Sequence, residues 1–472
     1  MVQHRKLTVL AAAVLCTSGA FAQESATEAK LRELSEKIER MRAESAQQIE
    51  QLRAQQKQLE AQQQQQQVVA KPAPEAAPEA VVKGDLPGSV KIPGTNTSVK
   101  IGGYARLDVV KDLGGGAFGS IAIPALVPFG GSTQSTRKGS FNMNARESRL
   151  YLKTFTPTSL GPVTTYFEGD FLGAGGNETV TNSSAFRLRH AYAELGPLLV
   201  GQTWTTFVDL ASYGETLDFA GGNGVLQGIR AGQIRYTAKV DGHNQLAFSA
   251  ENPESDIFGT TTTTMTAAVG PTSTTTLDKY PDLIAKYTYL DGWGRVTISG
   301  LARHLTFNNA GQAPVNGFVG GSGVTTGAWA LQGAINTFGQ DSVRYSVSGG
   351  SGVGRYVLGG AGNTAAVING GKLDAIRQKA FELAYQHYWT PAVRSNLVYG
   401  KIIEDYPHPA VPLSTPSHIA MLWANVIWSP IPNGWVGVEW ERATVKNDAV
   451  STPTLSDYGK NDRLLMSFQY GF

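Results

Sequence analysis

The last ten residues, "RLLMSFQYGF" (463–472), alternate strictly between large apolar side chains and side chains that are mostly small or polar. The apolar series is Leu464, Met466, Phe468, Tyr470 and Phe472. A period of two puts alternate side chains on opposite faces of a β-strand. The stretch therefore predicts a terminal strand with one face that must lie against a large apolar surface, up to its final residue.

The first 22 residues have the pattern of a secretory signal peptide. A charged start at 4–6 precedes an apolar run at 7–15 and an Ala-Phe-Ala cleavage motif at 20–22. Cleavage there would remove Cys16, the single cysteine of the chain. We therefore expect a mature protein without disulfides in an oxidising compartment, of which a bacterial envelope is the natural example.

Beyond the signal, the sequence has no apolar run of about 18 residues and so predicts no transmembrane helix. Backbone polar groups must be satisfied inside a bilayer, which leaves a closed β-barrel as the alternative way to cross it. The net charge of +2 in 472 residues implies no nucleic-acid partner.

Residues 23–67 are charged, rich in Gln and free of Gly and Pro. Leu, Ile and Met recur at heptad spacing, which predicts an α-helical coiled-coil stalk and hence an oligomer. The two series of the seam are Leu31, Ile38, Ser45, Leu52 and Leu59, and Leu34, Met41, Gln48 and Gln55. A disordered polar tail is the alternative. Residues 68–90 contain four prolines among Ala and Glu, and predict an extended linker.

From residue 91 to 472 the chain alternates segments of about ten residues with turns, the pattern of a membrane β-barrel. Short turns with Asp-Gly or Asn-Gly alternate with long Gly/Ser/Thr-rich connections, as in an outer-membrane barrel. Aromatic residues at strand ends, among them Trp389, Trp428 and Trp435, predict girdles at the membrane interfaces. We count sixteen predicted strands. They lie near residues 98–112, 145–157, 161–173, 185–197, 198–209, 233–240, 243–253, 281–291, 294–307, 325–339, 341–359, 379–391, 393–405, 417–430, 434–447 and 462–472.

A barrel of sixteen strands is wide enough to hold an aqueous channel. With the apolar face turned outward, for example Phe186, Leu188 and Tyr192 in "AFRLRHAYAEL", many basic residues point inward. Such a wall should favour anions over cations. The alternative is that these residues pair with inward acids such as Glu147, Glu168 and Asp170 and only stabilise the wall. The predicted pore-lining residues are Arg106, Arg149, Lys153, Arg187, Arg189, Arg235, Lys239, Lys286 and Arg303.

The long connection 207–232 is the candidate constriction loop, because it follows the fifth predicted strand. Its acidic residues Asp209, Glu215 and Asp218 would face the basic wall and set a transverse field. A surface loop with solvated acids is the alternative. No metal-ligand spacing of His and no GxSxG or HExxH motif occurs, so we expect neither an enzyme nor a cofactor.

The order of signal, heptad stalk and Pro/Ala linker, followed by "GSVKIPGTNTSVKIGGYARLDVVKDL" (88–113), resembles the DcaP-like trimeric outer-membrane porins. "RESRLYLKT" (146–154), "RLRHAYAELGPLLVGQTWTTF" (187–207) and the terminal Phe472 extend the resemblance. It implies a homotrimer in the bacterial outer membrane, with one channel per chain and the stalk in the periplasm. It also implies diffusion of small anionic solutes such as dicarboxylates, and recognition of Phe472 by the outer-membrane assembly machinery. A non-selective or sugar porin, and a tether acting through the stalk, remain alternatives.

Overall fold

A computed structural model of the chain describes residues 20–69, 82–116, 121–173, 175–177, 179–219, 221, 228–258, 277–310, 319–357, 364–406, 415–447 and 456–472. The expected signal peptide lies largely outside these residues. The chain divides into two units, 1–80 and 81–472, each described here by itself.

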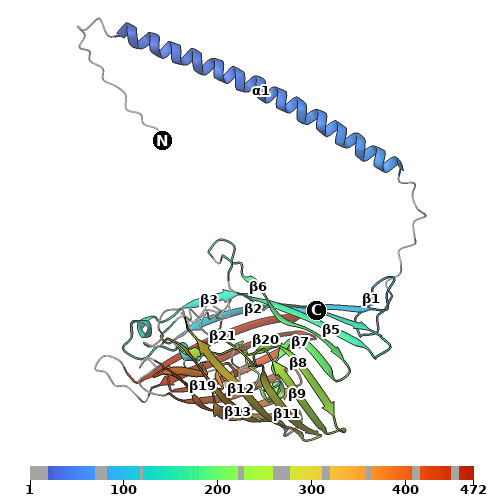
Figure 1. Cartoon of the computed structure of the whole chain (residues 1–472), viewed down its shortest axis with the longest axis vertical. Helices are drawn as coiled ribbons and strands as arrows, with labels where there is room; N and C mark the ends of the chain where they lie inside the picture. Colours follow the sequence, from blue (N-terminus) through green and yellow to red (C-terminus); the bar gives the residue numbers. More distant parts are fainter. Residues whose placement is uncertain are drawn as a thin grey trace, which may run out of the picture. The chain divides into compact units, whose positions relative to one another are not determined.

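The first unit contains one helix, α1 (Ala20–Val69), of 50 residues (Figure 1). Ile38, Met41, Leu52 and Leu59 of the expected seam are exposed on it. The coiled coil itself stays a prediction, because a single chain does not test it. Within the described part of the chain, no helix is both long and apolar enough to cross a membrane.

The second unit is a closed antiparallel β-barrel, and the described residues give its wall sixteen strands. β3 and β4 count as one interrupted strand because both pair with β2, and β1 (Val90–Lys91) only extends β2 at one end. β21 pairs with β2 and closes the barrel. The strands are β2 (Ser98–Asp112), β3 (Phe141–Asn144), β4 (Arg149–Thr156), β5 (Val163–Gly173), β6 (Ala185–Leu195), β7 (Leu198–Trp204), β8 (Arg230–Lys239), β9 (Asn244–Glu251), β11 (Asp282–Asp291), β12 (Gly294–Asn308), β13 (Gly321–Asn336), β14 (Ser342–Ser351), β17 (Arg377–Thr390), β18 (Val393–Asp405), β19 (His418–Ile431), β20 (Gly434–Lys446) and β21 (Tyr458–Gly471).

Every strand predicted from the sequence corresponds to one strand of the barrel wall. In β21 the residues Leu464, Met466, Phe468 and Tyr470 are exposed on the outer face, while the intervening Leu465 is buried inside. The Asn-Gly turn between β19 and β20 has Asn433 in the left-handed conformation (φ 61°), as a tight hairpin requires. The apolar outer face is therefore a property of the whole cylinder rather than of its last strand alone.

The predicted aromatic girdle is partly wrong. Trp389 and Trp428 are exposed on the outer face, but Trp435 is not. Trp435 packs beside the buried Leu217 and Ile427, and the guanidinium of Arg106 lies 5.5 Å from its ring centroid. Its ring therefore belongs to the interior, because the alternation within β20 points it there.

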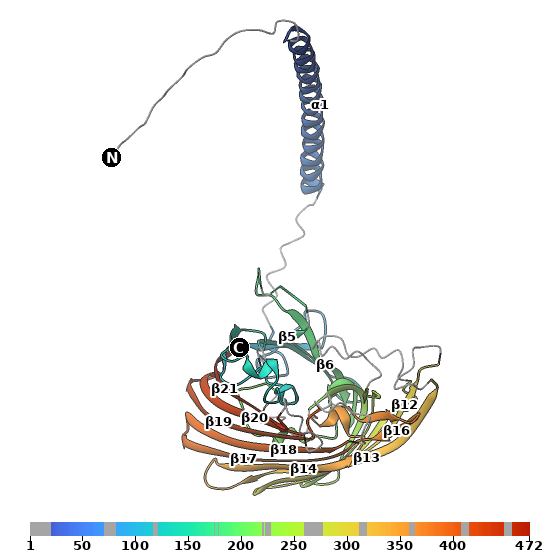
Figure 2. The same ribbon diagram turned by 90° about the vertical axis from the view of Figure 1, so that its left-hand side faces the viewer.

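The inner wall is apolar over β17, β18 and β19, the part of the curved sheet seen in Figure 2. Ala384, Val398 and Trp423 form one buried cluster there with Phe207 and Tyr356, which come from connections between strands. A second cluster joins β12 to a small sheet of three short strands, β10 (Ile257–Phe258), β15 (Ala366–Asn369) and β16 (Lys372–Ala375). Folded connections therefore cover this side of the interior.

The residues that lead into the barrel already pair with its unit from Lys83 on. Lys83 bridges to Val90, and the backbone N–H of Asp85 donates to the Ser98 hydroxyl (2.9 Å). The expected linker, 68–90, therefore overlaps the second unit at its end.

Candidate functional site

The connection between β7 and β8 lies inside the barrel, and the structure describes its residues 205–219, 221 and 228–229. Phe207 is fully buried and packs edge-on against Tyr356, with ring centroids 5.6 Å apart. A short 3-10 helix, η3 (Leu210–Ser212), follows, and the Asp209 carboxylate caps it by accepting a hydrogen bond from the Ala211 N–H. We call residues 205–219 the inner loop.

Asp209 attaches the inner loop to β12 and β13. Its carboxylate forms an ion pair with Arg295 (Nε at 2.9 Å) and accepts a hydrogen bond from Thr297 Oγ1 (2.8 Å). Its backbone N–H donates to Oε1 of Gln332 (2.7 Å). The side chain and the main chain of one residue thus bind two neighbouring strands.

Glu215 attaches the middle of the inner loop to β17, β18 and β19. The Arg394 guanidinium binds its carboxylate in a bidentate pair, with Nη2 at 2.6 Å and Nε at 2.7 Å. Gln386 donates to the same carboxylate (2.7 Å), and Asn425 donates to the Glu215 carbonyl (2.8 Å). Bidentate, charge-assisted pairs of this kind fix orientation as well as distance.

The end of the inner loop lies on β20 and β21. The backbone N–H groups of Leu217 and Asp218 each donate to the Glu439 carboxylate at 2.9 Å, and Arg463 lies 3.3 Å from Asp218. Leu217 is buried over Gly437, where an added Cβ would lie 2.9 Å from its side chain. The inner loop therefore follows the inner wall from β12 to β21.

The three acidic residues predicted for the constriction loop lie in this loop, but they pair with Arg295, Arg394 and Arg463. None of these arginines is among the predicted pore-lining residues. Strand alternation in the sequence could have identified these three arginines as inward-facing. Arg463, for instance, lies two residues before Leu465, whose side chain is buried inside the barrel. These ion pairs hold the loop to the wall.

On the opposite part of the wall, β5 and β6 carry a ladder of arginine–carboxylate pairs. Arg187 donates to both carboxylate oxygens of Asp170, through Nε (2.9 Å) and Nη2 (2.8 Å). Arg189 binds Glu168 (2.7 Å) and Asp170 (2.9 Å) and is 2% exposed. Arg149 of β4 lies 3.5 Å from Glu168. The alternative reading of the sequence, pairing with inward acids, thus applies to all three arginines.

A register shift in β6 changes which side chains face inward. Glu168 pairs with His190 and Gly169 pairs with Leu188, so Arg189 is an extra residue in the strand. Such a bulge reverses the alternation beyond it. Arg189 and His190 are consequently both buried, and Tyr192 lies opposite the inward Tyr166 (ring centroids 5.7 Å apart). The prediction that Tyr192 faces outward is wrong for this reason.

Three guanidinium groups lie at the Phe219 and Trp204 rings, and a fourth, that of Arg149, lies on the Tyr104 ring. Arg187 and Arg189 each lie 5.4 Å from the Phe219 ring centroid. The guanidinium of Arg230, at the start of β8, lies 4.6 Å from the Trp204 ring centroid and interacts electrostatically with Arg187 and Arg189. With Arg149 nearby, four cations face the carboxylates of Glu168 and Asp170, a formal excess of two positive charges. We call Arg149, Arg187, Arg189 and Arg230 the arginine cluster.

Arg230 is not among the predicted pore-lining residues, because the sequence prediction includes it in the long connection 207–232. The structure places it at the first residue of β8, paired with Trp204 of β7. Among the described residues it forms neither a hydrogen bond nor an ion pair. It is therefore the member of the cluster least committed to the protein itself.

The other predicted lining residues differ in their surroundings. Arg106 is ion-paired with Asp108 (2.8 Å) and Glu147 (3.0 Å), and Lys286 donates to the Val208 carbonyl of the inner loop (3.2 Å). Lys153, Arg235 and Lys239 form no ion pair with the residues that the structure describes. The sequence thus placed side chains of different function in one group.

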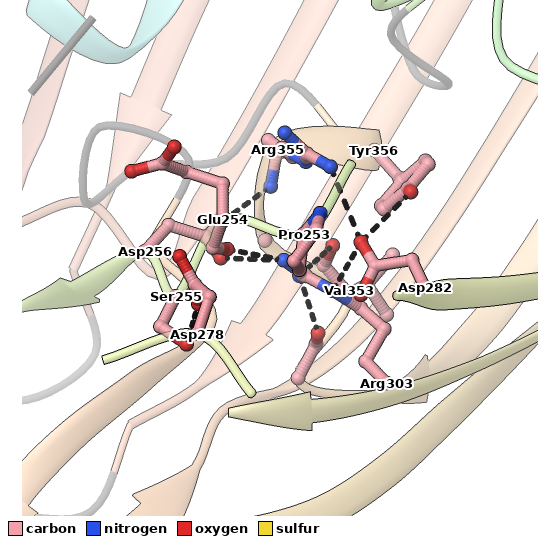
Figure 3. A network of polar contacts seen from close by, with 12 residues as sticks. Pro253, Glu254, Ser255, Asp256, Asp278, Asp282, Arg303, Val353, Arg355 and Tyr356 are labelled. Carbon is pink, nitrogen blue, oxygen red and sulfur yellow. Dashed lines mark hydrogen bonds and ion pairs between the residues drawn. The ribbon is translucent and has the colours of Figure 1, made fainter. Parts of the chain in front are cut away.

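Arg303 does not line a pore, and the prediction for it needs correction. Its side chain is fully buried, and it binds Asp282 of β11 (3.1 Å) and Asp256 (3.0 Å) (Figure 3). It also donates to the carbonyls of Glu254 and Val353. Arg303 therefore joins two connections to the wall.

Burial raises the pKa of the Asp256 carboxyl in this network to about 6, although Arg303 and Arg355 favour its ionised form. Arg355 and Tyr356 reach Asp282 at 3.2 and 3.0 Å. Figure 3 shows these groups directed toward one another, Asp282 and Arg303 from the barrel wall and Asp256, Arg355 and Tyr356 from connections. Among the described residues no group of three or more His, Cys, Asp or Glu side chains is arranged to hold a metal ion.

A row of aromatic rings adjoins the arginine cluster. The rings of Tyr151 and Tyr166 stack at 5.6 Å between centroids, Tyr166 lies 6.0 Å from His190, and His190 lies 5.3 Å from Trp204. These residues come from four successive strands, β4 to β7. The inner wall therefore offers planar apolar surface beside its cations.

Comparisons with known proteins agree with this architecture. The family model described as DcaP outer membrane protein matches residues 23–459. Porin Omp2b of Brucella canis is 28% identical over 330 residues, which cover 66% of this chain and 76% of that porin. The crystal structure of the outer membrane channel DcaP of Acinetobacter baumannii covers 80% of this chain and 97% of its own, with a TM-score of 0.63 and 22% identity.

Proposed function

Because the chain belongs to the DcaP outer membrane protein family and is an outer-membrane porin, we propose that it passes small anionic solutes of the dicarboxylate type. The observation that carries this proposal is the arginine cluster, whose four guanidinium groups exceed the adjacent carboxylates of Glu168 and Asp170 by two charges. The inner loop, whose Phe219 lies against Arg187 and Arg189, narrows the channel at this place.

The members of the cluster have separate tasks in this mechanism. Arg187 and Arg189 are held by Asp170 and Glu168 and supply a fixed positive potential. Arg230 and Arg149, which are less engaged, exchange hydrogen bonds with a passing carboxylate. Conduction requires that each contact be favourable enough to admit the solute and weak enough to release it. Two adjacent guanidinium groups that are only partly engaged meet that requirement for a solute with two carboxylates.

We also infer a homotrimer, with the α1 helices of three chains forming a coiled coil in the periplasm. The exposure of Ile38, Met41, Leu52 and Leu59 supports this arrangement, since a coiled coil would bury such a seam. Phe472 closes the barrel seam through reciprocal backbone hydrogen bonds with Gly103 (3.2 and 3.0 Å), while its ring is exposed. That exposed ring is the group we assign to recognition by the assembly machinery.

The aromatic row of Tyr151, Tyr166 and His190 favours a second candidate, a sugar porin, because aromatic faces bind the apolar faces of sugar rings. The two candidates differ in their charge dependence. Neutral sugars would pass at rates that do not depend on the arginine cluster. The rates for anions would depend on it.

Reversal potentials measured in a KCl gradient across a planar bilayer test the proposal. The native channel should prefer anions. Arg230→Gln should lower the anion-to-cation permeability ratio about fivefold, since one charge at about 4 Å in water is worth about 1 kcal/mol, and adding Arg149→Gln should lower the ratio further. Arg187→Gln and Arg189→Gln should act in the same direction. Arg442→Gln is the control, because Arg442 pairs with Asp462 on an exposed surface (2.7 Å). A cation preference, or a ratio unchanged in the cluster variants, contradicts the proposal.

A further inference from the structure

The outer face of β13, β14, β17 and β18 is hollowed near the rim of the long connections. The hollow has a volume of about 680 Å³. Trp329, Gly349, Lys379 and Ile403 lie in one row across these four strands, each directly opposite the next. Gly349 has no side chain, and the edge of the Trp329 indole lies within 3.5 Å of where its Cβ would be. The indole of Trp329 therefore packs over the backbone of Gly349, which is buried, and forms part of the floor of the hollow.

The neighbouring rows complete the hollow. Val347 and Phe381, directly opposite each other, are exposed beside it and extend its apolar floor. These side chains face outward, because the residues between them in the strands, such as Ser348 and Ala380, are buried inside the barrel. The hollow therefore opens to the surface on which the apolar outer face of the barrel lies.

Positive charge borders this apolar floor on the same outward face. Arg377 and Lys379 are exposed, and Lys401 lies directly opposite Phe381. The one carboxylate lining the hollow is that of Asp405, opposite Arg377. Among the described residues none of these four side chains forms an ion pair, so the border has a formal excess of two positive charges.

Charges on the outer face of a membrane barrel are costly toward the middle of the bilayer and tolerated at its interfaces. Arg377 is the first residue of β17, at the end of the barrel that carries the long connections. In outer-membrane barrels this rim lies on the extracellular side of the membrane. A cation at that depth contacts lipid headgroups, while its aliphatic stem lies on apolar surface. Clustered cations beside an apolar hollow thus match a lipid that has both acyl chains and phosphate groups.

We propose that this hollow is a binding site for a phosphorylated, acylated glycolipid of the outer leaflet. An acyl chain lies in the hollow against the exposed rings of Trp329 and Phe381, and a phosphate group accepts hydrogen bonds from Arg377 and Lys379. Charge complementarity selects this occupant over a second copy of the chain, which would have to bury these cations against carboxylates of its own. The site is separate from the channel, so the proposal does not depend on the solute that passes.

Native mass spectrometry of the delipidated protein, titrated with lipid A or with phosphatidylethanolamine, tests the site. The native protein should retain lipid A in preference to phosphatidylethanolamine. Arg377→Gln combined with Lys379→Gln should lower lipid A retention at least fivefold. Gly349→Leu, which displaces the Trp329 indole into the hollow without changing charge, should lower it as well. Arg137→Gln with Lys138→Gln is the matched control, since both are exposed cations in the connection between β2 and β3.

Unchanged single-channel conductance shows that each variant barrel is intact. Retention of lipid A by the Arg377/Lys379 variant at the native level overturns the proposal, and so does an equal loss in the control. A native protein that binds no lipid A, combined with dissociation of the oligomer in the Arg377/Lys379 variant, assigns the hollow to a neighbouring copy and also overturns it.

Discussion

Arginine has three different roles inside this barrel, and the partners of each arginine decide its role. Arg303 is buried among two carboxylates and several carbonyls and joins connections to the wall. Arg394 holds the inner loop through Glu215. Arg230 lies on a Trp ring without an acidic partner among the described residues. In the proposed mechanism, the donors offered to a solute come from Arg230 and from Arg149, which is only loosely paired with Glu168 (3.5 Å).

A further residue with a defined task is Asp341, in the turn between β13 and β14. Its carboxylate accepts hydrogen bonds from the Tyr388 N–H (2.8 Å), His387 Nδ1 (2.7 Å) and the Tyr385 hydroxyl (2.8 Å). The Tyr388 N–H, followed by His387, lowers the pKa of Asp341 to about 2. Because the folded pKa lies below the unfolded value of about 4, the stabilisation is present above that value and is lost as the pH falls through about 2.

We therefore expect the thermal midpoint of the native barrel to fall between pH 4 and pH 2, and Asp341→Asn to start lower at pH 7 and to fall less. Thermal unfolding followed by circular dichroism in detergent at these pH values measures both. Asp457→Asn, an exposed acid before β21, is the control and should behave as the native protein does. Equal pH profiles for native protein and Asp341→Asn would contradict this role.

At the scale of elements, the inner loop explains why part of the inner wall is apolar. A water-filled barrel is expected to alternate polar inward and apolar outward residues. Here Val398, Ile402 and Ile419 are buried inward residues, because the inner loop and neighbouring connections cover them. An added Cβ at Gly214 of the loop would lie 2.4 Å from Val398, so the loop lies directly on this wall. The loop and the wall thus form one packed element.

Glu215→Gln should loosen this element. The change removes the charge from the bidentate pair with Arg394, and we expect it to cost roughly 1–2 kcal/mol, because Glu215 is partly exposed. Single-channel recordings should show more frequent current fluctuations at a given voltage, since a less tethered loop moves within the channel.

Asp462→Asn is the matched control for this variant. It breaks the Arg442–Asp462 pair, which has the same chemistry but lies on an exposed surface (2.7 Å). Its recordings should equal those of the native channel. If current fluctuations in Glu215→Gln are no more frequent than in this control, the pair with Arg394 does not restrain the loop.

At the scale of the whole molecule, the barrel is closed by its own hydrogen bonds, from β2 around the wall to β21. The unit 81–472 contains every described strand, whereas 1–80 contributes α1 alone. Within the described residues, closure leaves no strand of the barrel wall at an open edge, as a lipid environment demands. We therefore expect channel formation to require only the second unit.

Deletion of residues 23–80 should leave single-channel conductance and ion preference unchanged, while the oligomer should dissociate at a lower temperature because the proposed coiled coil is lost. Planar-bilayer recording and gel electrophoresis over a temperature series measure these two properties. Loss of conductance with an intact barrel would favour the tether alternative and contradict a channel function independent of the stalk.

The sequence by itself determined the barrel, its strand number and its outward face, because alternation and turn chemistry act between near neighbours. It also placed the acids of the inner loop within the correct connection. It did not determine the partners of Asp209, Glu215 and Asp218, or the burial of Arg303, because these contacts join residues far apart in the chain. Only closure of the cylinder brings such residues together. One extra residue at Arg189 likewise reversed the facing of Tyr192, a shift that hydrogen-bond register decides and side-chain pattern does not.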